Sequence, residues 1–128
     1  MTWFDRTVAV TGAAGFLGSH LCEHLAEEGA SLVALDNFTN GNEAYLRDID
    51  ADIDIVDVDI RSMDADLLKG VDVIYHFAAI ANPRKCDDDP DLAHDINVTG
   101  TKNVFAAAAE HSVDRVVFSS IGVSSGSP

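Results

Sequence analysis

The chain has 128 residues, of which 8 are Lys or Arg and 22 are Asp or Glu, giving a formal net charge of −14. Its 47% hydrophobic content suffices for the core of one domain and excludes disorder over most of the length. No basic stripe exists that could replace phosphate counterions, so nucleic acid is not expected as a partner. The acidity fits either a halophilic protein or an ordinary acidic protein of the cytoplasm, and composition does not separate the two.

The sequence predicts no targeting segment, no membrane span and no metal site. The first residues lack the apolar run of a signal peptide, and no apolar run approaches the length of a membrane span, so the cytoplasm is the expected location. The two cysteines, Cys22 and Cys86, lie far apart and predict neither a disulfide framework nor a zinc site. The histidines outside the predicted strands show no ligand spacing, so no metal site is predicted.

The first half of the chain alternates buried apolar runs with amphipathic segments. Short apolar runs predict strands over 7–10 and 32–35, and period-2 alternation of Ile, Val and Asp predicts a strand over 53–60. Apolar residues three and four positions apart predict a helix over 16–28, which Gly29 ends. The polar segment between the second and third strands is expected to hold a short helix over 43–47.

The second half continues the same alternation. A helical turn is predicted over 64–69, a strand over 71–79, a long helix over 90–110 that begins at Pro90, and a strand over 115–119. Strands alternating with helices pair in parallel through right-handed crossovers. The expected fold is therefore α/β, a Rossmann-type doubly wound sheet with strand order 3-2-1-4-5. Such folds usually continue past a fifth strand, so we expect one partial domain over 1–128, truncated after strand five.

Three glycines, Gly12, Gly15 and Gly18, stand in a G-x-x-G-x-x-G spacing between the first predicted strand and the first predicted helix. In a dinucleotide site the first glycine permits the tight turn, the second the approach of pyrophosphate, and the third close packing of the helix. The helix start at Phe16 and Leu17 would then offer unpaired backbone N–H groups to the phosphates. A purely structural turn is the alternative, but the flanking strand and helix favour dinucleotide binding.

Two acidic positions at predicted strand ends fit the same ligand. Asp36, followed by Asn37, ends the second strand, where a carboxylate can accept hydrogen bonds from ribose hydroxyls. It would repel the 2′-phosphate of NADP, and no cation follows it before Arg47, so NAD is the expected cofactor. Asp59 and Ile60, after the third strand, are predicted to hold the adenine, although Asp59 can also be read as one more acid on an exposed face.

Six motifs in collinear order resemble those of the extended short-chain dehydrogenase/reductase family. Within it the chain is most similar to the NAD-dependent epimerase/dehydratase group, whose members act on nucleotide sugars. The resemblance covers nearly the whole chain and rests on these segments: Gly12 to Gly18, Asp36-Asn37, Asp59 to Arg61, His76 to Ala79, Asn97 to Thr101, and Phe118 to Ser120.

The resemblance implies roles for residues near the middle of the chain. Phe77, Ala78 and Ala79 would carry their backbone past the ribose and nicotinamide side of the cofactor. Asn97 resembles the asparagine that stabilises the central helix and its neighbouring loop near the active site. His76 is expected to be a packed, hydrogen-bonded strand residue and not a catalytic base.

The chemistry implied by the resemblance is transient hydride transfer from a sugar to NAD, with a tyrosine of a Tyr-x-x-x-Lys motif accepting the hydroxyl proton. The 128 residues hold no such motif, since Tyr45 and Tyr75 are not followed by lysine at that spacing. A serine usually assists; Ile121 stands where many relatives have it, and Ser120 or Ser124 is the candidate substitute.

We therefore expect the NAD-binding portion of a nucleotide-sugar epimerase or dehydratase, which is an isomerase or an oxidoreductase. These residues alone are expected to be inactive. The substrate-binding C-terminal region would be absent, and a nucleotide sugar would bind only the complete enzyme. A homodimer is consistent with the resemblance. The alternative is a stand-alone, non-catalytic NAD-binding module or sensor that a partner chain completes.

Overall fold

The computed structural model of the chain describes residues 6–37, 43–49, 52–77 and 95–118. Strands are labelled β, α-helices α, and the two 3-10 helices and one π-helix η. In chain order the elements are β1 (Thr7–Thr11), α1 (Phe16–Glu27), β2 (Ser31–Asp36), α2 (Ala44–Arg47), β3 (Ile53–Asp57), η1 (Ile60–Ser62), η2 (Ala65–Leu68), β4 (Val73–His76), η3 (Asp95–Gly100), α5 (Thr101–Glu110) and β5 (Arg115–Phe118).

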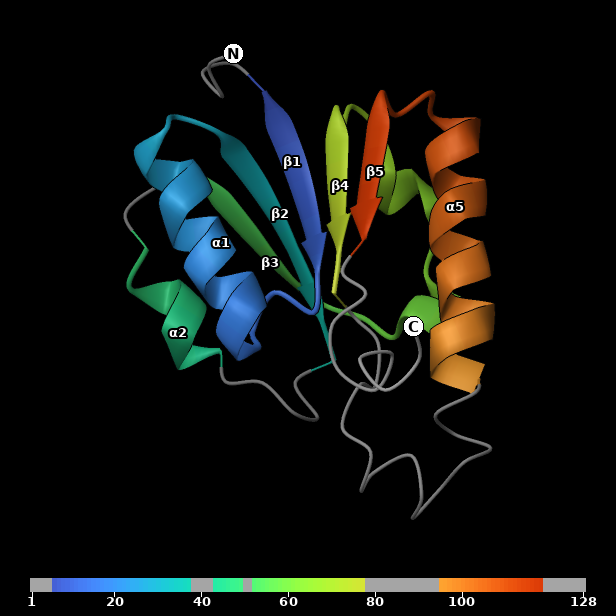
Figure 1. Ribbon diagram of the computed structural model, residues 1–128, viewed down its shortest axis with the longest axis horizontal. Helices are drawn as coiled ribbons and strands as arrows, with labels where there is room; N and C mark the ends of the chain where they lie inside the picture. The colour runs from blue at the N-terminus through green and yellow to red at the C-terminus, as the bar shows by residue number, and fades with distance from the viewer. Residues whose placement is uncertain (1–5, 38–42, 50–51, 78–94, 119–128) are drawn as a thin grey trace, which may run out of the picture.

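The five strands form one parallel sheet in the order β3-β2-β1-β4-β5, which confirms the predicted topology (Figure 1). The central strand β1 pairs with β2 on one side and with β4 on the other, with Val8 opposite both Leu32 and Val73. Because every strand runs in the same direction, all five carboxyl ends lie at one edge of the sheet. Ligands of doubly wound folds bind at this edge, beside the point where the strand order reverses.

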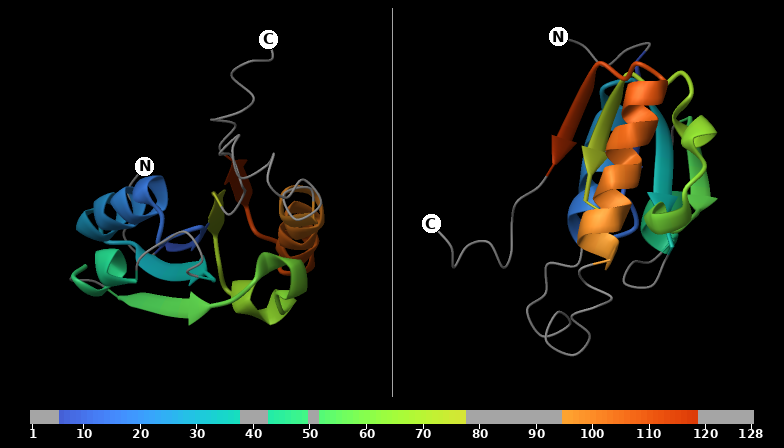
Figure 2. Two further views of the ribbon diagram at one scale, coloured as in Figure 1. Left: turned by 90° about the horizontal axis from the view of Figure 1, so that it is seen from below. Right: turned by 90° about the vertical axis from the view of Figure 1, so that its right-hand side faces the viewer.

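Helices cover both faces of the sheet, as Figure 2 shows in the view along the strands. Along β1, Val8 and Val10 pack into the cluster formed with α1 and α2, whereas Ala9 between them packs into the cluster formed with η1, η2 and α5. All three side chains are fully buried. This two-sided burial explains why β1 reads as a continuous apolar run with no polar alternation.

Within the described residues, most element bounds lie within one residue of the predicted ones, and larger differences occur in three places. The predicted strand over 53–60 ends at Asp57, because the Asp59 carboxylate accepts the Arg61 N–H and opens η1. The predicted strand over 71–79 is shorter, with β4 covering Val73–His76 of its described part. The described part of the helix predicted over 90–110 begins with the π-helical η3 and continues as α5. The predicted short helix and helical turn are α2 and η2.

The described helices include none that is both long enough and apolar enough to cross a membrane.

Cys22 lies on the inner face of α1 and is fully buried, so it acts as a small core residue. Burial raises the pKa of its thiol to about 12. In a Cys86→Ser variant we expect a thiol reagent at about pH 8 to leave the folded protein unmodified, because the reactive form is the thiolate. Titration with a disulfide reagent should give one thiol only after denaturant is added. Rapid modification of the folded variant would contradict this packing.

Candidate functional site

The loop over residues 12–15, called the glycine loop below, joins β1 to α1 at the carboxyl edge of the sheet. Gly12 has a φ of 68°, in the left-handed region that glycine adopts without strain. Its N–H donates to the carbonyl of Leu35 in β2 at 2.8 Å, and its own carbonyl accepts the N–H of Gly15 at 3.2 Å. The loop is therefore a tight turn anchored on the neighbouring strand.

Gly18 lies in the first turn of α1, pressed against this loop. A Cβ atom at this position would lie 2.3 Å from the Gly12 carbonyl oxygen and 2.9 Å from the Ala13 Cα. A Cβ at Gly15 would instead lie 3.4 Å from the Gly12 oxygen, which is ordinary contact. Of these two positions, only Gly18 has no room for a side chain, as its predicted packing role requires.

The N-terminus of α1 opens onto solvent. Gly15 precedes the helix and has no side chain that could cap it, and the first turn carries no acidic residue. Phe16 and Leu17 are 73% and 44% exposed. Because the first N–H groups of an α-helix have no acceptor within it, this turn presents donors and a partial positive charge. An anionic group can reach them from solvent.

Asp36 connects the glycine loop to the ends of β2 and β3. Its Oδ2 accepts the Ala14 N–H at 2.9 Å, and its carbonyl accepts the Val58 N–H at 3.0 Å. The residue is half-buried, and Asn37 after it is exposed. The predicted carboxylate therefore lies beside the glycine loop, at the edge where the exposed turn of α1 begins.

Asp59 and Arg61 shape the segment after β3. Arg61 Nε lies 3.0 Å from each carboxylate oxygen of Asp59, and the Arg61 N–H donates to Oδ1 at 2.9 Å. These hydrogen bonds, led by the one from the Arg61 side chain, hold the pKa of Asp59 below its usual value. Ile60 between them is buried. Asp59 thus fixes the turn η1, while its contact with adenine stays a prediction.

A buried histidine ties three elements together under the same edge. His76 Nδ1 forms a hydrogen bond with Thr11 Oγ1 at 2.7 Å, and Nε2 forms one with Thr101 Oγ1 at 2.9 Å. Thr11 Oγ1 also accepts the Phe77 N–H at 3.0 Å. Burial lowers the pKa of His76, which favours the neutral ring. The prediction of a packed, hydrogen-bonded histidine is confirmed.

Two residues of this region were given no role from the sequence: Asn103 was not named, and Gly100 was named only within the segment Asn97 to Thr101. Asn103 Nδ2 donates to the carbonyls of Ile60 at 3.1 Å and Arg61 at 2.6 Å. A Cβ on Gly100 would lie 2.5 Å from Ile60 Cδ1. Together they hold η1 against the helical segment. The sequence did hold a signal for Asn103. It lies four residues before the buried Ala107, on the same face of the helix, where an amide without a hydrogen-bond partner is costly.

Most of the remaining predicted site residues fall outside the part of the chain that the structure describes. Ala78, Ala79, Ser120 and Ser124 lie outside the described residues, and Asn97 falls in η3. The structure therefore brings together the glycine loop, Asp36, Asn37 and the Asp59–Ile60 turn, and places Phe77 at the end of β4.

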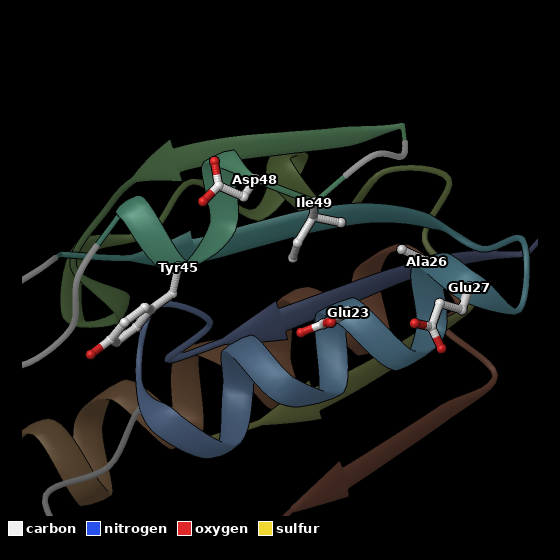
Figure 3. Close-up of a pocket in the computed structure, with 6 residues that line it drawn as sticks. All are labelled: Glu23, Ala26, Glu27, Tyr45, Asp48 and Ile49. Atoms are coloured by element: carbon white, nitrogen blue, oxygen red, sulfur yellow. The ribbon is translucent and has the colours of Figure 1, made fainter.

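A hollow of about 270 Å³ lies elsewhere, on the outer flank between α1 and α2 (Figure 3). None of its lining residues belongs to the glycine loop. It is lined by Glu23, Ala26, Glu27, Tyr45, Asp48 and Ile49.

Comparison with known proteins identifies the family. The model of the NAD dependent epimerase/dehydratase family matches residues 8–123, and the chain belongs to this family, which confirms the resemblance drawn from the motifs. A putative UDP-glucose 4-epimerase of Methanocaldococcus jannaschii is 38% identical over 118 residues, covering 90% of this chain and 38% of the relative.

Solved structures agree. An epimerase from Methanothermobacter thermautotrophicus superposes with a TM-score of 0.85 at 32% identity, covering 94% of this chain and 36% of that one. UDP-glucose-4-epimerase from Stenotrophomonas maltophila, with bound NAD and formylated UDP-arabinopyranose, gives 0.82 at 29% identity, covering 88% and 36%. The chain thus spans well under half the length of these proteins.

The contact at Gly18 makes a sharp prediction. Gly18→Ala should destabilise the protein by about 3 kcal/mol or more, since the added methyl meets backbone that cannot rotate away. Gly15→Ala is the matched control and should change stability by less than about 1 kcal/mol, because its backbone is extended, with a φ of −77°, and its neighbour is at contact distance. Urea unfolding measures both. Equal losses in the two variants would contradict the packing described.

His76 should make stability depend on pH. The folded protein holds the ring neutral, whereas the unfolded chain takes up a proton below the ordinary value of 6.5. Its contribution is therefore complete at higher pH and is lost as the pH falls through about 6.5. Urea unfolding at several pH values between about 7.5 and 5.5 gives the free energy of unfolding as a function of pH. The slope of this free energy against pH should be shallower for His76→Asn than for the original protein. His24→Gln, which removes an exposed imidazole from α1, is the matched control for the loss of one histidine. Parallel slopes for His76→Asn and the original protein would contradict a desolvated ring.

Proposed function

We propose that these residues form the NAD-binding portion of a nucleotide-sugar epimerase or dehydratase. One observation carries the proposal, namely that the Asp36 carboxylate is fixed on the Ala14 N–H, beside the uncapped and exposed first turn of α1. An acceptor for hydroxyl groups and a set of donors for phosphate thus lie at one end of the sheet. A dinucleotide carries the groups that such a site would bind, because its adenosine ribose hydroxyls lie next to its pyrophosphate.

The phosphate end is supported by the glycine loop. Backbone N–H groups of Phe16 and Leu17 would bind the pyrophosphate, where the helix dipole favours negative charge. Gly15 leaves the approach free of a side chain, and Gly18 keeps the helix close to the loop. The exposure of this first turn fits a bound group that would cover it.

The ribose end is supported by the acid at the end of β2. Asp36 would accept hydrogen bonds from the adenosine ribose, and its negative charge would oppose the 2′-phosphate of NADP. Solved UDP-glucose 4-epimerases from Stenotrophomonas maltophila and Thermus thermophilus contain NAD. We therefore propose NAD as the cofactor of this chain.

The two ends of the cofactor would meet different segments. We propose that Asn37, Asp59 and Ile60 line the adenine side, with the turn η1 held in place by Asn103. Phe77, with Ala78 and Ala79 after it, would line the nicotinamide side at the end of β4. Asn97 would support the adjoining helical segment.

Bound NAD supplies a reversible acceptor of hydride from a sugar carbon. The 128 residues contain no Tyr-x-x-x-Lys, so they supply no tyrosine and lysine pair for proton transfer. Ser120 or Ser124 would bind the reacting hydroxyl. We propose that these residues by themselves bind NAD and turn over no nucleotide sugar.

Calorimetric titration of NAD and NADP tests the proposal. We expect NAD to bind more tightly than NADP, and Asp36→Asn to weaken NAD about tenfold or more, because a hydrogen bond to a charged acceptor is lost. The same variant should reduce the ratio of NAD affinity to NADP affinity. Asp54→Asn, which removes one charge from an exposed position on β3, should bind NAD like the original protein.

Two results would overturn this assignment. Equal or tighter binding of NADP by the original protein would remove the role given to Asp36. An equal loss of NAD affinity in Asp54→Asn would show that overall charge, and not the position of Asp36, governs binding.

A further inference from the structure

A group of three potential metal ligands lies at the opposite edge of the sheet from the glycine loop. Asp66 belongs to η2, Glu110 is the last residue of α5, and His111 follows it. η2 leads towards the start of β4 and the end of α5 towards the start of β5, so the group lies near the amino ends of these strands (Figure 1). It shares no residue with the proposed NAD site.

The imidazole of His111 is the unusual member. Its Nε2 is buried and has no hydrogen-bond partner among the described residues, although the side chain as a whole is 17% exposed. The carboxylates beside it are far more open, at 76% for Asp66 and 61% for Glu110. A buried nitrogen without a partner costs free energy, so this atom requires a proton shared with the carboxylates or a bound ion.

The distances favour an ion. Nε2 of His111 lies 3.3 Å from Asp66 Oδ1 and 3.4 Å from Glu110 Oε2, and the three ligand atoms all lie within 4.8 Å of one another. A charge-assisted hydrogen bond would be shorter, at about 2.7–2.9 Å. Ligands about 2.0–2.1 Å from a tetrahedral ion are separated from each other by about 3.3–3.4 Å. The two separations therefore match neighbouring ligands around one metal.

We propose that Asp66, Glu110 and His111 form a site for a divalent transition-metal ion of the zinc class. Two carboxylates and a neutral imidazole carry a charge of −2, which a divalent cation neutralises. The nitrogen ligand favours zinc, cobalt or nickel over magnesium and calcium, which prefer oxygen ligands. Exposure of both carboxylates leaves the remaining coordination position to water.

The backbone already holds the ligands in place. Asp64 Oδ1 accepts the Asp66 N–H at 2.9 Å, and the His111 N–H donates to the Ala107 carbonyl at 3.1 Å. η2 and α5 also bury Leu68 and Ala107 in the same core cluster. A bound ion would thus link two elements that already pack together, and it should stabilise the fold rather than change it.

Zinc binding to chelator-treated protein tests the site by calorimetry, in buffer with millimolar Mg²⁺ to occupy weak carboxylate sites. We expect one equivalent of Zn²⁺ to bind, and Asp66→Asn and His111→Gln each to weaken it about tenfold or more. Zn²⁺ should raise the unfolding temperature of the original protein by several degrees and that of the two variants by much less.

Two controls separate this site from other ligands of the chain. His24→Gln removes an exposed imidazole and Asp54→Asn an exposed carboxylate, and both should bind Zn²⁺ like the original protein. Co²⁺ used in place of Zn²⁺ should give the strong visible absorption of tetrahedral cobalt, which His111→Gln should lose. These measurements need no NAD, so they are independent of the proposed function.

Three results would overturn the proposal. They are undiminished Zn²⁺ affinity in Asp66→Asn, whose exposed side chain can change without unfolding the protein, displacement of Zn²⁺ by Mg²⁺, and no Zn²⁺ binding at all.

Discussion

The close approach of α1 to the loop after β1 is the constraint on which the candidate site depends. Gly18 lies so near the Gly12 carbonyl that a Cβ atom would be only 2.3 Å from it. This contact sets the position of the helix relative to the sheet and brings its open N-terminus to the carboxyl ends of β1 and β2. Asp36 then reaches the Ala14 N–H from the neighbouring strand. Without that approach, the donors of the helix and the acid of β2 would not share one edge.

The other half of the molecule is held to this edge by polar side chains. His76 connects Thr11 in β1 to Thr101 at the start of α5, and Asn103 fixes the carbonyls of η1. These groups are buried or half-buried, where hydrogen bonds are strong and unpaired atoms are costly. The carboxyl edge is thus kept in shape by residues that need not touch a cofactor. These residues position the segments that carry the predicted binding residues.

The two edges of the sheet carry different chemistry. At the carboxyl edge, backbone N–H groups and one fixed carboxylate suit a dinucleotide, as in the family to which the chain belongs. At the amino edge, two exposed carboxylates converge on a buried imidazole nitrogen. Under the two proposals, the position of an acid decides its purpose. Asp36 beside the helix donors would bind the ribose of a cofactor, whereas Asp66 and Glu110 beside an imidazole would bind a cation.

The sequence alone determined the alternation of strands and helices, the glycine turn and the acid at the end of β2, because each follows from local periodicity and turn chemistry. It also predicted the strand order, because alternating strands and helices pair in parallel through right-handed crossovers. It misplaced the end of the third strand, where the Asp59 side chain bonds to its own loop. Only the tertiary structure revealed Asn103 and the meeting of Asp66 with His111. These contacts join segments remote in the chain, and packing of η1 and η2 on α5 decides which side chains come within a few ångströms.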